Sequence, residues 1–296
     1  MTKFKGVIPA LVSPLNADET INSAVLKRLT DDLLQAGADG FYIGGATGEG
    51  IALNTKERMV LAETAVDAVS KRKPCIVHVA STNFNDAILL SKHAEEIGAD
   101  AISAIPPLFF QYDEDDVYNY YKALANAVHI PLMIYFNPAA GFSINAKFAA
   151  KMFQIDTITS IKWTSSDYFG MMALKDLTHG EMNIINGPDE MLLMGLSAGA
   201  DGGIGTTYNF MLPLIRGIYD NYVDQNMEKA QQYQTKVCRI IRQLSGIPII
   251  PATKAILEHM GYEVGNAAFP QKRLTDEQKA AVIQKILAAG WNDDKL

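Results

Sequence analysis

Cysteine and paired histidines are scarce in this sequence. Only two cysteines occur among its 296 residues, Cys75 and Cys238, and they form no CxxC motif. This scarcity argues against a disulfide framework and against a structural zinc site. The five histidines are scattered along the chain without an HxxxH pair. We therefore expect no metal site, because transition-metal ligands usually come in closely spaced sets.

Long apolar runs and an excess of positive charge are also missing. No apolar run reaches the roughly 18 residues that a membrane span needs, and the N-terminus lacks the features of a signal peptide. We therefore expect a cytoplasmic protein without a membrane partner. The 26 basic and 33 acidic residues give a net charge of −7. A nucleic-acid surface needs a basic stripe, so we expect no nucleic-acid partner. Small anionic substrates remain possible, because they respond to local charges.

What the sequence does contain is eight short runs of apolar and small residues, separated by segments of helical periodicity. The runs span residues 6–14, 40–45, 75–81, 101–107, 131–136, 158–163, 182–187 and 202–207. Such near-continuous runs are typical of strands buried on both faces of a parallel sheet. The phrase Gly-Ala-Asp recurs before three of them, where the glycine fits the end of a helix.

Eight βα units predict an α/β protein with a (β/α)₈ TIM barrel. The alternative is a doubly wound open sheet, which needs fewer strands and usually a glycine-rich first turn. Beyond about residue 211 the pattern becomes purely helical, and no linker rich in Pro, Gly or Ser separates it from the rest. We expect a barrel domain over residues 1–225 and a C-terminal helical extension over 226–296 that packs on the barrel.

Two helix starts carry capping-box spacing. Asn54 stands three residues before Glu57, and Thr275 stands three residues before Gln278. In this arrangement the two side chains satisfy each other's backbone N–H groups. Both positions therefore predict the first turn of a helix.

A lysine inside an apolar strand is the most informative single residue. Lys162 follows the run Ile158–Ile161. An unprotonated amine can attack a ketone carbonyl, and burial favours that form. The imine that results is an electron sink that allows a neighbouring C–C bond to break. The competing interpretation is a lysine that reaches the barrel rim or forms a buried ion pair.

Other polar groups follow neighbouring strands, at the end of a TIM barrel that carries function. The turn "GGATGEG" (44–50) exposes backbone N–H groups that can hold a carboxylate, although glycine turns are common. Tyr135 ends the fifth run and fits either a general acid/base or a core tyrosine. Asp189 and Glu190 fit either helix N-terminal charges or ligands for sugar hydroxyls.

Taken in order, these motifs resemble the pyruvate-dependent class I aldolases of the dihydrodipicolinate synthase and N-acetylneuraminate lyase superfamily. The resemblance runs through "GGATGEG", "YFNP", "IKWTSSDYF", "NGPDE" and "GIGTTYN" to the helical tail. It is closest to the N-acetylneuraminate lyase branch. The dihydrodipicolinate synthase branch normally has an arginine shortly after the tyrosine of "YFNP", and residues 138–141 contain none.

The resemblance implies a role for each matching position. Lys162 would form the Schiff base and Tyr135 would move the proton, so that no cofactor is needed. The sites that would bind substrate are Ala46 and Thr47 for the pyruvyl carboxylate, and Thr164, Gly187, Asp189, Glu190 and Thr206 for the sugar-derived chain. The resemblance also suggests a homotetramer.

Two positions depart from the family pattern. Ala46 stands where a serine or threonine is usual, and Phe109 stands where the family usually has a tyrosine lent by a neighbouring subunit. Both changes remove hydroxyl groups from around Tyr135. The expected activity is cleavage of N-acetylneuraminate to N-acetylmannosamine and pyruvate. The alternatives are another pyruvate aldolase or dehydratase, for example one for a 2-keto-3-deoxy sugar acid, and a non-catalytic relative that binds pyruvate-like ligands.

Overall fold

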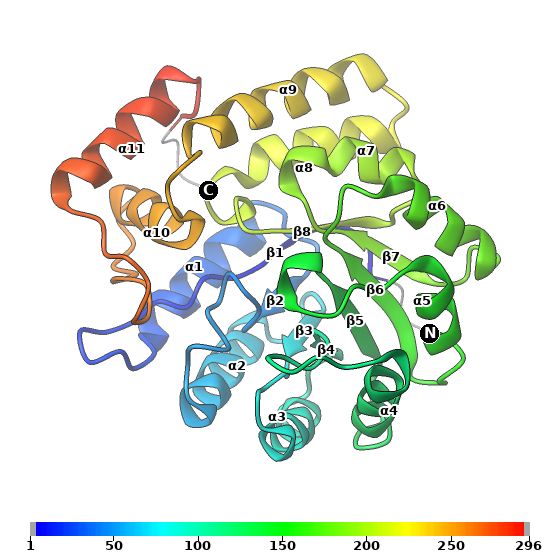
Figure 1. Ribbon diagram of the computed structural model, residues 1–296. Coiled ribbons are helices and arrows are strands. Elements are labelled where there is room, and N and C mark those ends of the chain that lie inside the picture. Colours follow the sequence, from blue (N-terminus) through cyan, green and yellow to red (C-terminus); the bar gives the residue numbers. More distant parts are fainter. Residues whose placement is uncertain (1–3, 293–296) are drawn as a thin grey trace.

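The computed structural model describes residues 4–292, and its strands surround a central axis (Figure 1). The strands are β1 (Gly6–Pro9), β2 (Phe41–Ile43), β3 (Cys75–His78), β4 (Ala101–Ala104), β5 (Leu132–Phe136), β6 (Ile158–Trp163), β7 (Asn183–Asn186) and β8 (Gly202–Gly205). They pair in parallel in the order β1-β8-β7-β6-β5-β4-β3-β2. An isolated bridge between Ala10 and Tyr42 brings β1 to β2 and nearly closes the ring. The predicted TIM barrel is confirmed, and the open sheet is excluded.

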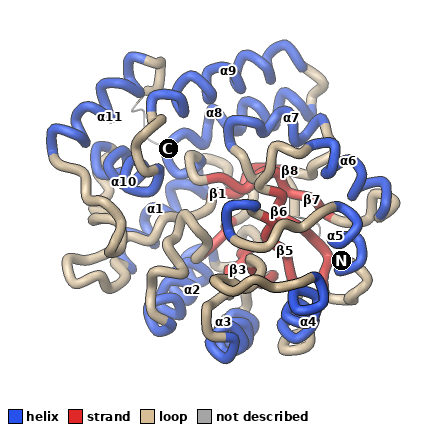
Figure 2. Tube along the Cα trace, in the orientation of Figure 1, coloured by secondary structure: helices blue, strands red, loops and turns tan. Residues whose placement is uncertain are grey.

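Helices alternate with the strands and form an outer ring around them (Figure 2). They are α1 (Ser23–Gln35), α2 (Thr55–Val69), α3 (Phe84–Glu96), α4 (Glu114–Ala125), α5 (Ala146–Met152), α6 (Tyr168–Leu177), α7 (Leu192–Ser197) and α8 (Tyr208–Val223), with short 3₁₀ helices η1 (Pro138–Ala140) and η2 (Asp189–Met191). Every strand residue is buried. This two-sided burial explains why the strand runs are almost continuously apolar.

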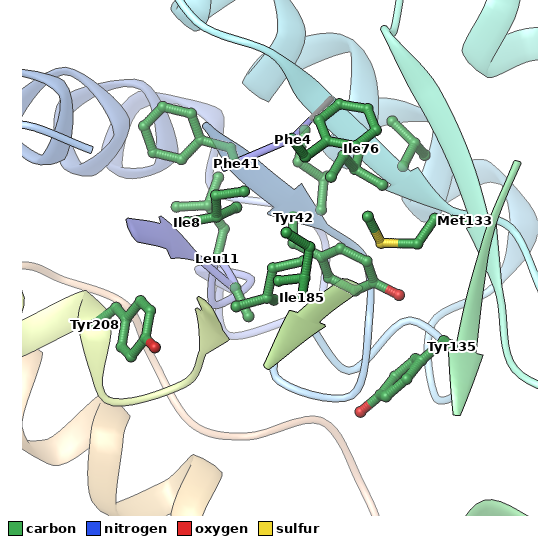
Figure 3. Close-up of a cluster of buried hydrophobic side chains, with 14 of the residues drawn as sticks. Phe4, Ile8, Leu11, Phe41, Tyr42, Ile76, Met133, Tyr135, Ile185 and Tyr208 are labelled. Carbon is green, nitrogen blue, oxygen red and sulfur yellow. The ribbon is translucent and has the colours of Figure 1, made fainter. Parts of the chain in front are cut away.

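The barrel interior is filled by side chains from facing strands. Figure 3 shows the rings of Tyr42 and Tyr135 directed into this interior, together with Met133 and Ile185. All four side chains are at most 4% exposed. The barrel is therefore a packed core, and the space available for a ligand lies beyond the ends of its strands.

Three further helices follow the barrel: α9 (Met227–Gln243), α10 (Ile249–His259) and α11 (Asp276–Ala288). In Figure 1, α9 runs along the outside of α7 and α8, and α10 and α11 lie at the edge of the barrel near α1. The hydroxyl of Tyr262, just after α10, donates to Asp32 on α1 at 2.6 Å. The helices of the C-terminal extension are confirmed, whereas the division into domains at residue 225 stays a prediction.

Only one of the two predicted capping boxes is complete. At α11 the hydroxyl of Thr275 accepts from the Gln278 N–H, and the Gln278 side chain accepts from the Thr275 N–H. At α2 the Asn54 side chain accepts from the Glu57 N–H at 2.9 Å. The Glu57 carboxylate instead accepts from the N–H of Ile21 at 2.8 Å. A tertiary hydrogen bond thus takes the place of the local one.

Across residues 4–292, no helix is long and apolar enough to cross a membrane. The same part of the chain contains no group of three or more His, Cys, Asp or Glu side chains that could hold a metal ion.

Candidate active site

The two residues predicted to carry the chemistry lie side by side. Tyr135 on β5 and Lys162 on β6 are direct partners in the parallel register. Parallel partners point to the same face of a sheet, so both side chains enter the barrel interior. The Lys162 Nζ lies 4.1 Å from the centre of the Tyr135 ring and 4.7 Å from that of Tyr42.

The surroundings of Lys162 bear on the two competing interpretations, a lysine that reaches the barrel rim and a buried ion pair. Its side chain is buried, with 6% exposure, so it does not extend to the rim into solvent. No carboxylate among residues 4–292 lies within 4.0 Å of its Nζ, which excludes an ion pair within that range. Aromatic faces supply the nearest stabilisation for a charged form, and they stabilise it far less than a carboxylate would. The two competing interpretations are thus excluded, and the role of Lys162 as the Schiff-base former stays a prediction.

A neutral histidine lies close to Tyr135. The ring of His78 on β3 is 6.1 Å from that of Tyr135, and its Nε2 accepts from the N–H of Ile105. Burial holds the pKa of His78 well below its usual value, and the charges of Arg58 and Lys162 add to this effect. His78 therefore contributes shape and no charge to the surroundings of Tyr135.

The glycine-rich turn after β2 lies across the barrel from β6. Its Thr47 is buried, and the Thr47 hydroxyl lies 2.6 Å from that of Thr206 after β8. Ala46, by contrast, is exposed. The contact joins two of the predicted substrate-binding residues from segments 159 residues apart.

The remaining predicted residues line one cleft at the carboxyl ends of β6, β7 and β8. This cleft has a volume of about 460 Å³. It is lined by Thr164, Ser165, Ser166, Gly187, Pro188, Asp189, Glu190, Met191, Thr206, Thr207, Ile241 and Ile249. The structure thus brings together Thr164, Gly187, Asp189, Glu190 and Thr206, whose role in binding a substrate stays a prediction. The mixture of hydroxyl groups, carboxylates and backbone suits a polar chain of several carbons.

Asp189 lines the cleft and also holds the backbone after β8 in place through hydrogen bonds. Its Oδ2 accepts from the N–H of Thr207 at 2.8 Å and from the Thr207 hydroxyl at 2.7 Å. Burial raises the pKa of Asp189 to about 6, and the bonds from Thr207 oppose that rise. A Cβ at Gly205 would lie 2.1 Å from Asp189 Oδ1. The carboxylate can therefore lie against β8 only because residue 205 is a glycine.

Glu190 differs from Asp189 although it is the next residue. Its side chain is exposed at the cleft. No hydrogen bond of its carboxylate to another residue occurs within 4–292. An exposed carboxylate on the wall of a polar cleft is free to accept from hydroxyl groups of a ligand.

Several residues of the site were not found from the sequence. Thr207 holds Asp189, and its only signal was its place beside Thr206. Ile241 and Ile249 come from α9 and α10 and form an apolar part of the cleft wall. Their own segments read as ordinary amphipathic helices, so no local pattern marks them. The contact of these two residues with the cleft depends on tertiary packing, which no local pattern encodes.

A (β/α)₈ barrel with a buried lysine and a polar cleft at the carboxyl ends of its strands is the architecture of the class I pyruvate aldolases, and comparison with known proteins places the chain in that superfamily. The model of the Dihydrodipicolinate synthetase family matches residues 3–289. The chain therefore belongs to this family, whose named relatives are lyases and aldolases.

Individual relatives are similar over nearly the whole chain. An N-acetylneuraminate lyase from Rhizobium meliloti is 33% identical over 284 residues, covering 96% of this chain and 95% of the relative. The solved structure of YagE, a prophage protein from E. coli in complex with pyruvate, has a TM-score of 0.93 at 26% identity, covering 98% and 99% of the two chains. CdNal from Clostridium difficile, solved with mannosamine, has a TM-score of 0.93 at 29% identity, covering 97% and 100%.

Proposed function

We propose that this protein cleaves N-acetylneuraminate reversibly to N-acetylmannosamine and pyruvate through a Schiff base on Lys162. One observation carries the proposal: a buried lysine without a carboxylate partner, 4.1 Å from the ring of a tyrosine, below a polar cleft. The name of the Rhizobium meliloti relative supports the choice of substrate. The complexes of relatives with pyruvate and with mannosamine are in accord with the two products.

The chemistry uses only side chains of this protein. The Lys162 amine attacks the 2-keto carbon, and loss of water gives a protonated imine. Tyr135 takes the proton of the C4 hydroxyl while the C3–C4 bond breaks, and the bonding electrons move into the imine to form an enamine. Protonation at C3 and hydrolysis then release pyruvate and free Lys162. The imine is the electron sink, so the proposal requires no metal or organic cofactor.

Binding of the substrate divides between the two sides of the barrel mouth. Backbone N–H groups at Ala46 and Thr47 hold the pyruvyl carboxylate, and the Thr47–Thr206 contact fixes that turn against β8. The remaining cleft residues Thr164, Gly187, Asp189, Glu190 and Thr206 bind the hydroxylated chain. The exposed carboxylate of Glu190 is suited to accept from hydroxyl groups.

A second candidate is another pyruvate aldolase or dehydratase of the superfamily. The observation that favours it is the absence of two hydroxyl groups, since Ala46 and Phe109 stand where the family pattern has them. A substrate that needs no proton relay around Tyr135 would tolerate these changes. The third alternative is a non-catalytic relative that binds pyruvate. The position of Tyr135 beside Lys162 argues against it, because binding alone needs no acid/base group there.

Borohydride trapping followed by turnover assays separates these functions. With pyruvate and borohydride we expect a stable mass addition on the peptide that carries Lys162, and none in Lys162→Ala. Assays on N-acetylneuraminate and on a panel of 2-keto-3-deoxy sugar acids then identify the substrate. Trapping on another lysine would overturn the mechanism. Trapping on Lys162 without turnover of any panel member would favour the non-catalytic relative.

We further propose that the protein acts as a homotetramer in the cytoplasm. Phe109 and Phe110 are 92% and 70% exposed, next to one another in the loop after β4. On α6, Phe169 and Met172 are 86% and 57% exposed. Large exposed apolar side chains gathered in this way mark surfaces between protein chains. Both cysteines are unpaired, in accord with a reducing compartment.

A further inference from the structure

The turn between β2 and α2 contains a carboxylate that the proposed chemistry does not use. Glu49 belongs to the segment "GGATGEG", three residues after Ala46. Its side chain is completely buried, with 0% exposure, and it does not line the cleft. A buried carboxylate costs free energy unless several donors satisfy it. The groups that donate hydrogen bonds to the Glu49 carboxylate therefore indicate its role in the structure.

All of the side-chain partners of Glu49 come from the C-terminal extension. Its Oε1 lies 2.6 Å from the Nζ of Lys254 on α10, whose side chain is 2% exposed. Its Oε2 accepts from the Ala268 N–H at 2.6 Å and from the Gln271 side chain at 2.7 Å. Lys254 also donates to the carbonyl of Asn266 at 2.8 Å. One carboxylate thus joins the turn to α10 and to the loop 266–271.

The backbone of the turn depends on the same residue. Glu49 has a φ of +56°, a left-handed conformation that side chains other than glycine rarely adopt. Its N–H donates to the carbonyl of Ala46 at 3.0 Å. On the other side, the Ser13 hydroxyl donates to the carbonyl of Gly48 at 2.5 Å. The direction of the peptide groups at Ala46 and Thr47 is therefore fixed between the segment after β1, which contains Ser13, and the extension.

We propose that Glu49 and Lys254 are positioning residues through which the C-terminal extension holds the turn that binds the pyruvyl carboxylate. This inference rests on the proposed function, because it takes Ala46 and Thr47 as the carboxylate site. The extension then has a part in binding the keto-acid end of the substrate, although no residue of this ion pair touches it. Lys162 and Tyr135 lie on β6 and β5 and make no contact with the pair, so chemistry and carboxylate binding are separable.

The paired variant Glu49→Gln with Lys254→Met tests the inference. Together the substitutions remove both charges and leave no unpaired ion in the interior. The amide introduced in place of the carboxylate keeps an acceptor for the Ala268 N–H. We expect the pyruvate concentration for half-maximal borohydride trapping to rise about tenfold, roughly the loss of one aligned hydrogen bond to a charged group. The maximal trapping rate at saturating pyruvate should stay within about twofold, since Lys162 is unaffected.

Gln271→Ala provides a milder second variant. Gln271 is half-buried and supplies one of the donors to Glu49 Oε2, so its loss leaves the ion pair in place. We expect a rise of about threefold in the half-maximal pyruvate concentration, again at an unchanged maximal rate. This variant keeps the test decisive even if the paired variant does not fold.

Tyr262→Phe is the matched control. Tyr262 also joins the extension to the barrel, through its bond to Asp32 on α1, but it does not contact the turn. It should lower thermal stability without changing the half-maximal pyruvate concentration. The inference is overturned if Gln271→Ala and the paired variant, where it folds, keep the wild-type value, or if Tyr262→Phe raises it equally. Failure of the wild-type protein to trap pyruvate would instead overturn the proposed function.

Discussion

At the scale of single residues, the hydroxyl of Tyr135 has no hydrogen-bond partner within residues 4–292, as is also true of the buried hydroxyls of Tyr120 and Tyr208. Tyr135 differs from those two in that the centre of its ring lies 4.1 Å from the Lys162 Nζ. A tyrosine that served only the core would normally have its hydroxyl satisfied, as Tyr121 does by donating to the Ala104 carbonyl at 2.9 Å. An unbonded hydroxyl on a ring that lies beside Lys162 supports a functional role for Tyr135.

We expect Tyr135→Phe to lower kcat for cleavage by roughly 10²- to 10⁴-fold, the usual contribution of a positioned acid/base group. Imine formation should persist, because the ring beside Lys162 keeps its shape. Steady-state kinetics and borohydride trapping measure the two effects separately. Tyr121→Phe, which removes a buried hydroxyl away from the lysine, serves as control. Near-normal turnover of Tyr135→Phe would remove Tyr135 from the mechanism.

Asp189 leads to a prediction about pH. Its pKa rises on folding from 3.8 to about 6 because the carboxyl is buried. Between these values the folded protein binds more protons than the unfolded chain, so this residue makes stability fall as pH rises from about 4 to about 6. The shift corresponds to about 3 kcal/mol at and above neutral pH.

Asp189→Asn should remove this pH-dependent loss while keeping an oxygen to accept from Thr207. We expect the free energy of unfolding of the variant, relative to wild type, to grow by up to about 3 kcal/mol between pH 4 and pH 7. Urea unfolding at a series of pH values measures it. A difference that stays constant across this range would show that Asp189 does not titrate there.

At the scale of elements, β8 is built largely of glycine because side chains from elsewhere press against it. A Cβ at Gly205 would lie 2.1 Å from Asp189 Oδ1 and 2.4 Å from the Tyr208 ring. Gly205→Ala should therefore displace Asp189 and lower stability by about 1–3 kcal/mol. The kcat/KM for the sugar substrate should fall more than pyruvate trapping does.

Gly180→Ala is a useful comparison for that experiment. Gly180 has a φ of +74°, and a Cβ there would meet nothing within 4 Å. Alanine at this position should cost about 1 kcal/mol from backbone conformation alone, with no effect on kcat/KM. If Gly205→Ala lowered pyruvate trapping as strongly as sugar cleavage, Asp189 would not be a determinant of the sugar chain.

The elements themselves could be predicted from the sequence because their patterns are local. The eight strand runs, the lysine within β6 and the polar residues after β7 and β8 all follow from periodicity and from where function lies in a barrel. Contacts between distant segments could not be predicted in this way. Ile249 on the cleft wall and Lys254 beside Glu49 both lie on α10, whose sequence has no unusual pattern. The Glu57 side chain accepts from the Ile21 N–H instead of completing the capping box with Asn54.

At the scale of the whole molecule, the family resemblance suggests a homotetramer, and the exposed phenylalanines of the loop after β4 are a candidate surface for its assembly. We expect wild-type protein to elute as a tetramer, and the double substitution Phe109→Ser with Phe110→Ser to shift it toward smaller species. Light scattering coupled to size exclusion measures the masses. Substitution of the exposed Leu89, 49% accessible on α3, is a control for general loss of apolar surface. An unchanged mass would place the interface elsewhere.

The bond between Glu49 and the loop after α10 also bears on how the protein is made. Glu49 and Ala268 are separated by 219 residues. At roughly 5–20 residues per second, a ribosome needs about 10–40 s to add that length of chain. Until then the carboxylate of Glu49 lacks its hydrogen bonds from Ala268 and Gln271. Full affinity for pyruvate would thus be acquired only once synthesis is nearly finished, and chains that end before Ala268 would bind the keto acid more weakly.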